Sequence, residues 1–375
     1  MKLAIISPFA PYRGGIAKET EVIYSHLRKS YEVKIINFKR QYPSILFPGK
    51  NQYIKNNFFF SNKDIIRLID TLNPFTWRKT ANYIIENKFD KIIFRYWHPF
   101  FIPAYTYIIN YLKKENSSIE IFSICDNIYP HERFIFDIKI IQNFLKKIDY
   151  YYVMSNNTYD QLNSFIPENR IEKIYLPIDN TLGPLIDKKT AREKLNYKTS
   201  LSLLFFGLIR EYKGLDVLLK SMKSLVKEIS DIKLYIVGEC YENEIKYKTI
   251  IDDCQLSENI VWVNEYISDK DINLYFSSCD VVVLPYKQTS QSGIIPIAYK
   301  YNKLVLASNI NGINDYVIPG KTGYLFEKNN YNSLSKTIVD IYKKHDFSLS
   351  EKYIEKFKKR FDSEQLVEKI ISFMN

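Results

Sequence analysis

The chain has few of the residues that crosslink proteins or bind metal ions. Its 375 residues include only four cysteines and four histidines. The cysteines lie far apart, and their spacing fits neither a disulfide framework nor a zinc site. They are Cys125, Cys240, Cys254 and Cys279. We therefore expect buried thiols of a cytosolic protein, with no bound metal and no cofactor.

Long apolar runs are absent as well. No stretch of about 18 or more uncharged apolar residues occurs, so the sequence predicts no membrane-spanning helix. The apolar and aromatic segment 99–112 is too short and contains two prolines. The chain opens directly on an apolar strand, so we also expect no signal peptide. These features predict a cytoplasmic protein.

Acidic residues are scarce at the start of the chain. Residues 1–100 hold 17 Lys and Arg against 7 Asp and Glu, whereas the remainder holds 36 against 35. Basic residues interleaved with aromatic ones favour an anionic membrane surface, at roughly 1 kcal/mol per well-placed cation. We expect residues 1–100 to bind the inner face of the cytoplasmic membrane peripherally, and no nucleic acid, because no recognised motif is present. The alternative is a solvated basic face beside a core cluster. The residues concerned are Phe47, Phe58, Phe59, Phe60, Trp77, Lys50, Lys55, Lys63, Arg67, Arg78 and Lys79.

Apolar strands alternate with helical segments in both halves of the chain, which predicts parallel α/β sheets. The segment 175–190 contains Pro177, Gly183 and Pro184 and is the best linker. We predict two Rossmann-like domains facing a cleft, residues 1–179 and 180–348, with the helices of 349–375 packing back across the boundary. Ligands of such sheets bind beyond the carboxyl ends of the strands. Strands are expected at 3–7, 33–38, 91–96, 119–125, 151–154, 203–208, 233–237, 260–263, 281–284 and 305–308.

Two strand-end loops carry glycines at a helix start. Gly14 and Gly15 allow a close approach of the backbone to a ligand, although such a pair more often marks only a tight turn. Gly207 opens the second loop, in which Arg210 and Lys213 can neutralise a leaving diphosphate. Exposed cations at such a position are otherwise simply solvated.

Two further strand ends of the second half predict a binding site. Gly238 gives room for a nucleoside, Glu239 is either a ligand or a solvated side chain, and Tyr266 either lines a base pocket or is an ordinary core aromatic. The block 281–308 reads as a strand, a small-residue loop, a short helix and a strand. That arrangement aims backbone N–H groups at a phosphate or diphosphate. The residues of this loop are Thr289, Ser290, Gln291, Ser292, Gly293 and Ile294.

Polar residues also follow two strands of the first half. His98 and the pair His131 and Glu132 fall in strand-end loops, although a lone histidine is more often structural. Asp126 follows a strand as well and is placed to accept the proton of an acceptor hydroxyl. We expect these residues to contact the donor or the acceptor.

The pattern Gly-x-Ile-Arg-x-Tyr-Lys-Gly at 207–214, together with Gln-Ser-Gly at 291–293, resembles a subgroup of the bacterial retaining glycosyltransferases of family 4. The resemblance implies a GT-B fold, a nucleotide-diphosphate sugar donor, retention of anomeric configuration without a metal, and a surface-glycan or lipid-linked acceptor. Lys213 matches the family lysine that binds the donor phosphates. Leu208 stands where the family arginine stands, and Arg210 lies two residues further on. The resemblance also places Gly14 and Gly15 beside the donor diphosphate and the acceptor.

The acceptor half and the donor loop each depart from the family pattern. Asp126 replaces a family histidine that contacts the transferred sugar, while His131 and Glu132 match the pattern. Thr289 and Ile297 replace the two carboxylates of the family's Glu-x7-Glu motif. These losses leave two alternatives to an active enzyme. One is a catalytically silent GT-B partner subunit, and the other is a non-enzymatic, membrane-associated protein that binds anionic glycolipid.

Overall fold

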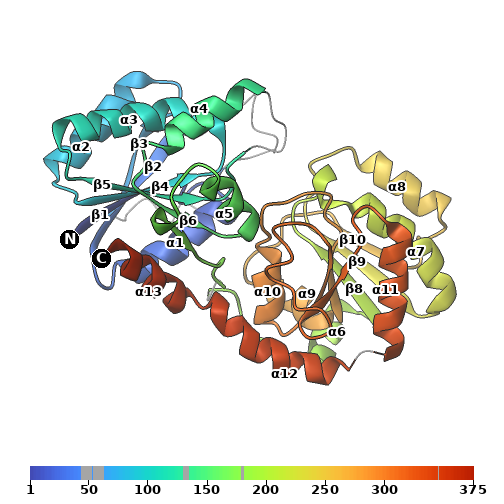
Figure 1. Cartoon of the computed structure of the whole chain (residues 1–375). Helices are drawn as coiled ribbons and strands as arrows, with labels where there is room; N and C mark the ends of the chain where they lie inside the picture. The colour runs from blue at the N-terminus through green and yellow to red at the C-terminus, as the bar shows by residue number, and fades with distance from the viewer. Residues whose placement is uncertain (44–52, 54–62, 130–134, 179–180, 345) are drawn as a thin grey trace. The chain divides into compact units, whose positions relative to one another are not determined.

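The computed structural model describes residues 1–43, 53, 63–129, 135–178, 181–344 and 346–375 (Figure 1). In the segment 135–178, side chains are described from residue 138 onward. Two compact units make up the chain. The first comprises Met1–Pro177 and Ser363–Asn375, and the second Ile178–Asp362. The helix α12 (Phe347–Phe357) thus belongs to the second unit and α13 (Ser363–Met374) to the first, although the sequence groups both in 349–375.

The first unit is built on a seven-stranded sheet of order β3-β2-β1-β4-β5-β6-β7, in which every neighbouring pair is parallel. In Figure 1, α2, α3 and α4 cover one face of this sheet, and α1 and α13 lie against the other. The strands are β1 (Lys2–Ile6), β2 (Glu32–Arg40), β3 (Ile65–Asp70), β4 (Lys91–Tyr96), β5 (Glu120–Cys125), β6 (Tyr150–Val153) and β7 (Ile171–Lys173). The helices are α1 (Gly15–Leu27), α2 (Pro74–Glu86), α3 (Ile102–Glu115), α4 (Ile135–Leu145), α5 (Asn156–Asn163) and α13.

The second unit has a six-stranded parallel sheet of order β10-β9-β8-β11-β12-β13. On this sheet α7 packs between α8 and α11, and α6 packs against α9. The strands are β8 (Leu201–Phe206), β9 (Ile232–Val237), β10 (Ile260–Val263), β11 (Val281–Leu284), β12 (Leu304–Ser308) and β13 (Gly323–Phe326). The helices are α6 (Lys188–Leu195), α7 (Leu215–Glu228), α8 (Glu244–Asp253), α9 (Ile272–Ser278), α10 (Ile294–Lys300), α11 (Tyr331–Lys344) and α12.

Parallel strands buried on both faces explain why apolar runs identify the central strands. The helix α7 buries one face because its apolar residues recur at helical spacing, and Leu215, Leu218, Leu219 and Met222 are all buried. Each unit has a separate hydrophobic core between its sheet and its helices. Among the described residues, no helix has the length and hydrophobicity needed to cross a bilayer.

Three edge strands are not expected from the sequence. The strand β3 is only half-buried and carries Arg67, and β7 is just three residues long. The strand β13 begins at Gly323, where a Cβ atom would lie 2.2 Å from the carbonyl oxygen of Val305. Edge strands are short and partly exposed, so they lack the continuous apolar run that marks a central strand.

Candidate functional site

The strand order reverses between β8 and β11 in the second unit, and between β1 and β4 in the first. Open parallel sheets bind ligands beyond the carboxyl ends of their strands at such a reversal. The loops that follow these four strands contain Gly14 and Gly15, His98, Arg210 and Lys213, and the segment 289–294. Each unit therefore gathers sequence-predicted residues at its own reversal point.

Two glycines bring the ends of β8 and β9 close together. Gly207 has a φ of 100°, and Gly238 has a φ of 142°. A Cβ atom on Gly238 would lie 2.3 Å from the carbonyl oxygen of Gly207, so no other residue fits there without a backbone shift. Gly238 is therefore required by the close approach of β9 to the backbone of Gly207, and room for a nucleoside beside it stays a prediction.

Hydrogen bonds and close backbone packing connect the loop after β8 to the loop after β11. The N–H of Lys287 donates to the carbonyl of Tyr212 at 2.7 Å, and the Lys287 ammonium lies 3.0 Å from Asp216. Gly214 has a φ of 69° and packs against the carbonyl of Pro285, where a Cβ atom would lie at only 1.9 Å. These contacts hold the short helical turn Glu211–Lys213 in place.

Lys213 is buried in this turn, with 8% of its surface exposed. Its ammonium nitrogen lies 3.0 Å from the position that a Cβ atom on Gly207 would occupy, and 5.8 Å from the centre of the Tyr286 ring. Burial, followed by the nearby charge of Arg210, lowers the pKa of Lys213 to about 8. Among the described residues, no carboxylate pairs with this ammonium group. The solvated cation that the sequence allows as an alternative is therefore not what the structure shows.

Arg210 adds a second cation to the same loop. Its side chain is half-buried, and its guanidinium carbon lies 5.4 Å from the centre of the Tyr241 ring. A stacked guanidinium keeps its N–H groups available at the ring's edge. Burying a cation without a partner is costly, so a loop that holds Lys213 beside Arg210 is suited to an anion.

The loop 289–294 is ordered by its own hydrogen bonds. The Thr289 hydroxyl donates to the carbonyl of Gln291 at 2.5 Å and accepts from its N–H, and the N–H of Ile294 donates to the Ser292 hydroxyl at 3.3 Å. Ser290 and Ser292 are buried. Gly312, with a φ of 93°, packs beneath the carbonyl of Ser290. Two of the backbone N–H groups that the sequence assigns to a phosphate are thus engaged inside the loop.

The remaining predicted donor residues lie on neighbouring strand ends. Glu239 is half-buried, and its carbonyl accepts a hydrogen bond from the N–H of Ile209 at 2.9 Å. Tyr266 follows β10 and is 57% exposed, so it is not the core aromatic that the sequence left open. The side chain of Ile294 lies 3.5 Å from the position of a Cβ atom on Gly207.

In the first unit, Gly14 and Gly15 are exposed at the start of α1, and Gly14 has a φ of 123°. His98 follows β4 and is also exposed. Its Nδ1 accepts a hydrogen bond from the N–H of Phe100 at 3.1 Å, so it caps the short helical turn Pro99–Phe101. His131 and Glu132 lie outside the described residues.

Asp126 belongs to a buried cluster that the sequence does not reveal. The Arg95 guanidinium is 1% exposed, donates from Nε to Asp126 at 2.6 Å, and also pairs with Glu19. Asp126 itself is 4% exposed. Two carboxylates share one guanidinium, so the cluster carries one excess negative charge when both are ionised. A direct contact of Asp126 with a substrate stays a prediction.

Glu19 is the most exposed member of this cluster, with 18% of its side chain accessible. Burial raises the pKa of Glu19 to about 7, with Arg95 opposing the rise and Asp126 adding to it. One carboxylate oxygen lies 3.7 Å from the position of a Cβ atom on Gly15. The helical spacing of four residues between Gly15 and Glu19 is the signal that identifies this residue in the sequence.

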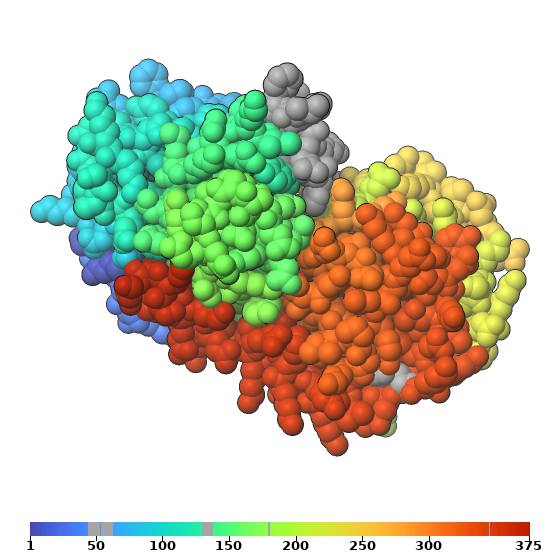
Figure 2. Space-filling model, viewed as in Figure 1, coloured from blue at the N-terminus to red at the C-terminus, as the bar shows by residue number. Residues whose placement is uncertain are grey.

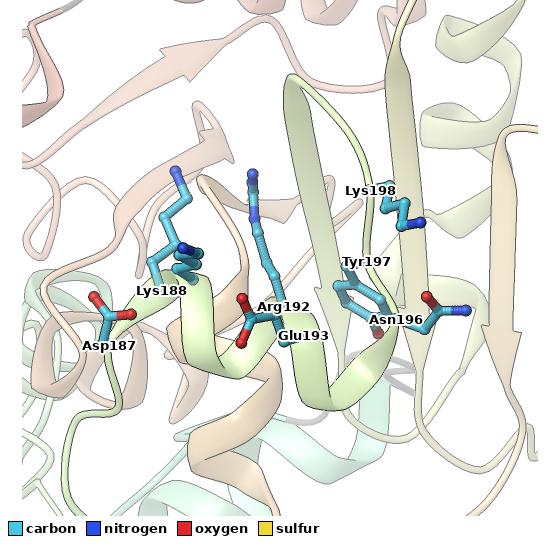
Figure 3. Close-up of a pocket in the computed structure, with 8 residues that line it drawn as sticks. Asp187, Lys188, Arg192, Glu193, Asn196, Tyr197 and Lys198 are labelled. Atoms are coloured by element: carbon cyan, nitrogen blue, oxygen red, sulfur yellow. The ribbon is translucent and has the colours of Figure 1, made fainter.

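A pocket of about 540 Å³ lies along α6 in the second unit, where Lys188 and Arg192 project from the helix (Figure 3). Both cations pair with Asp280, which precedes β11, and Arg192 also donates to Ser202 near the start of β8. The pocket therefore lies at the amino ends of the strands, at the edge of the sheet away from Lys213. Lys188 and Arg192 therefore share the single carboxylate of Asp280.

Residues 187–360 match the family model "Glycosyl transferases group 1". Two curated relatives align with parts of the chain. A GDP-mannose:glycolipid 4-beta-D-mannosyltransferase of Xanthomonas campestris pv. campestris is 36% identical over 126 residues, 32% of this chain and 34% of the relative. A lipopolysaccharide 1,2-N-acetylglucosaminetransferase of Salmonella typhimurium is 30% identical over 141 residues, 36% of this chain and 37% of the relative. The chain thus aligns with only about a third of the length of either relative.

Solved structures match the whole chain at low identity. The Anabaena protein HepE in complex with UDP has a TM-score of 0.77 and 14% identity, covering 100% of this chain and 99% of that one. Sucrose-phosphate synthase of Thermosynechococcus elongatus has a TM-score of 0.76 and 16% identity, covering 100% and 98%. These likenesses confirm the predicted pair of parallel-sheet α/β domains of the GT-B fold. The match to the group 1 glycosyl transferase model lies within the second unit.

Proposed function

We propose that the protein is a glycosyltransferase that moves a sugar from a nucleotide-diphosphate sugar to a surface-glycan or lipid-linked saccharide acceptor. Transfer retains the anomeric configuration and requires no metal ion. The observation that carries this proposal is the buried Lys213 ammonium, which lies beside Gly207 without a carboxylate partner among the described residues. A desolvated cation at a strand-end reversal is suited to a diphosphate.

In the transfer, the bond between the sugar C1 and the diphosphate oxygen breaks while C1 bonds to an acceptor hydroxyl oxygen. Negative charge then grows on the leaving diphosphate, where Lys213 and Arg210 stabilise it. The stabilisation is larger than in water because Lys213 is held out of solvent. The proton of the acceptor hydroxyl passes to the departing diphosphate. No other base is needed for atoms and charges to balance.

On the acceptor side we assign a binding role to Glu19. Its carboxylate lies next to Gly15, whose missing side chain leaves the nearer oxygen uncovered. Pairing with Arg95 keeps the carboxylate oriented, and a sugar hydroxyl can donate a hydrogen bond to it. His98, Asp126, His131 and Glu132 stay predicted acceptor-side residues.

The relatives support this substrate class without fixing the base or the sugar. The Xanthomonas relative is named for GDP-mannose and a glycolipid, and HepE was solved with UDP and with UDP-glucose. The Xanthomonas relative is named as a 4-beta-D-mannosyltransferase. The anomeric configuration of the product is therefore the property to measure when retention is tested. Proton NMR of the product would show the donor's configuration if retention holds, and the opposite configuration would overturn that part of the proposal.

Calorimetric titration with UDP, GDP and their sugars tests donor binding. We expect one of them to release heat with the native protein and with Lys220→Met, which removes an exposed cation of α7. The same nucleotide should bind Lys213→Met at least about tenfold more weakly, because a charge-stabilising donor is lost. Absence of heat with every nucleotide would overturn the enzyme assignment.

That negative result would favour a catalytically silent partner subunit. The observation behind this second candidate is the replacement of two family carboxylates by Thr289 and Ile297. Ile297 has no polar group to hold a ribose, and the Thr289 hydroxyl is engaged with Gln291.

A further inference from the structure

Among the described residues, Phe75 is the most exposed large apolar side chain, at 85%. Leu72, three residues earlier, is 52% exposed. Leu72 lies in the turn between β3 and α2 of the first unit, and Phe75 is the second residue of α2. Singly exposed apolar side chains are ordinary, but two large ones in one turn indicate a surface that meets something apolar.

The turn that carries them is firmly built. The N–H of Leu72 donates to the Asp70 carboxylate at 3.0 Å, and the N–H of Phe75 donates to the side chain of Asn73 at 3.1 Å. The Trp77 indole donates to the carbonyl of Asp70 at 2.8 Å. Proline at position 74 begins the helix, where its missing N–H costs nothing. These bonds define the backbone of the turn, and neither apolar side chain folds back into the core.

Cations follow these apolar residues, and acids do not. Arg78 and Lys79 are exposed one helical turn after Phe75. The only acid of α2 is Glu86, its last residue, and the only acid of the adjacent α3 is Glu115, also its last. Trp77 and Tyr107 link the two helices, with ring centres 6.0 Å apart. Figure 1 shows α2 and α3 side by side on one face of the sheet.

We propose that Leu72, Phe75, Arg78 and Lys79 form a docking surface for a bilayer that contains anionic phospholipid. The two apolar side chains enter the interfacial region, and the two cations contact lipid phosphates. A small apolar projection beside cations suits a deformable interface, whereas a protein partner would need a broader complementary face. The space-filling view shows part of the light-blue to cyan segment, which includes α2, projecting from the surface (Figure 2).

This docking surface deepens the proposed function, because it would bring the enzyme to lipid-linked acceptors. It also restricts the predicted membrane-binding region to a smaller part of residues 1–100. Of the lysines that the sequence analysis assigns to this region, Lys50 and Lys55 lie outside the described residues. In the described part of the first unit, the two apolar residues of the proposed docking surface are Leu72, just before α2, and Phe75, within it.

Co-sedimentation with vesicles tests the docking surface. The native protein should bind vesicles of phosphatidylcholine with phosphatidylglycerol, and bind pure phosphatidylcholine vesicles about tenfold or more weakly. The double variant Leu72→Ser/Phe75→Ser should bind the anionic vesicles about tenfold more weakly, because burial of both side chains is lost. Arg78→Gln/Lys79→Gln should show a similar loss at low salt, and the difference should shrink as salt is added.

Ile245→Ser is the matched control, since Ile245 is 68% exposed on α8 in the second unit. It should bind vesicles like the native protein. The fluorescence of the tryptophan in a Phe75→Trp variant should be quenched by brominated lipids in the same vesicles. Native-like binding by Leu72→Ser/Phe75→Ser, or failure of the native protein to bind anionic vesicles, would overturn the docking surface.

Nucleotide calorimetry on the same variants separates this proposal from the proposed function. Leu72 and Phe75 belong to the first unit and Lys213 to the second. The variant Leu72→Ser/Phe75→Ser should therefore release the same heat on nucleotide binding as the native protein. Absence of nucleotide binding by the native protein would overturn the enzyme assignment without changing the conclusion from the vesicle experiment.

Discussion

Lys213→Met should stabilise the second unit while weakening the proposed binding of a nucleotide diphosphate at least about tenfold. Methionine has nearly the length of lysine and no charge to desolvate, so it suits a position that is 8% exposed. The pKa of Lys213 falls from 10.5 to about 8 on folding. A fall of this size corresponds to about 3 kcal/mol of destabilisation by the protonated side chain at pH 7.

The sign of the pH dependence follows from the same values. Between pH 8 and 10.5 the unfolded chain holds a proton on Lys213 that the folded protein has released, so native stability rises with pH in this window. The variant lacks this rise. Its advantage of about 3 kcal/mol at pH 7 should therefore shrink as the pH passes 8, and nearly vanish at about pH 10.5.

Scanning calorimetry measures the effect as a shift of the thermal transition of the second unit. For a domain of this size, about 3 kcal/mol corresponds to about 6–12 °C at pH 7. Lys220→Met, on the exposed face of α7, is the matched control and should shift the transition by less than about 2 °C. A variant at Lys213 that melts at or below the native temperature at pH 7, or whose advantage does not change with pH, would refute the reasoning.

Three other changes test the neighbouring features. Gly207→Ala places a methyl group 3.0 Å from the Lys213 ammonium at a φ of 100°, and should weaken nucleotide binding at least about tenfold by calorimetry. Glu19→Gln should flatten the pH dependence of the first unit's melting temperature between about pH 4.5 and 7. Native stability falls with rising pH there, because the folded protein holds a proton that the unfolded chain releases. Thr289→Glu breaks the hydrogen bonds to Gln291 and should cost about 1 kcal/mol in urea unfolding. It should not strengthen nucleotide binding, and a sharp gain would identify a decayed site.

The central strands and the loops that follow them could be predicted from the sequence because each leaves a local pattern. The strands β1, β4, β8 and β11 are mostly apolar, Gly207 and Gly238 follow strands directly, and Gly14 and Gly15 end the loop after β1. Glycine at a strand end is informative, since three of these four adopt a φ that other residues avoid. This is why the central strands and the loops that follow them could be predicted, whereas the strand order could not.

Burial and pairing across the sheet could not be predicted in the same way. Lys213 reads as an exposed cation, and only the packing of the loops after β8 and β11 shows that it is desolvated. Arg95 reads as the polar end of a strand. Its pairing with Glu19 and Asp126 joins residues 76 and 31 positions away along the chain. Such contacts depend on register between strands, which a single sequence does not encode locally.

Each reversal point holds a buried charge that is not fully neutralised, and the sign of this charge differs between the two units. In the second unit, Lys213 is buried beside Arg210 with no acid to balance it among the described residues. In the first unit, Arg95 is buried between two carboxylates, and burial, with a smaller contribution from Asp126, raises the pKa of Glu19 to about 7. A core built only for stability would neutralise both clusters. An unbalanced cation attracts a diphosphate, and an unbalanced carboxylate accepts a hydrogen bond from a hydroxyl group. These are the two partners of the proposed sugar transfer, so under this proposal each unit carries the charge suited to one substrate at a cost to its own stability.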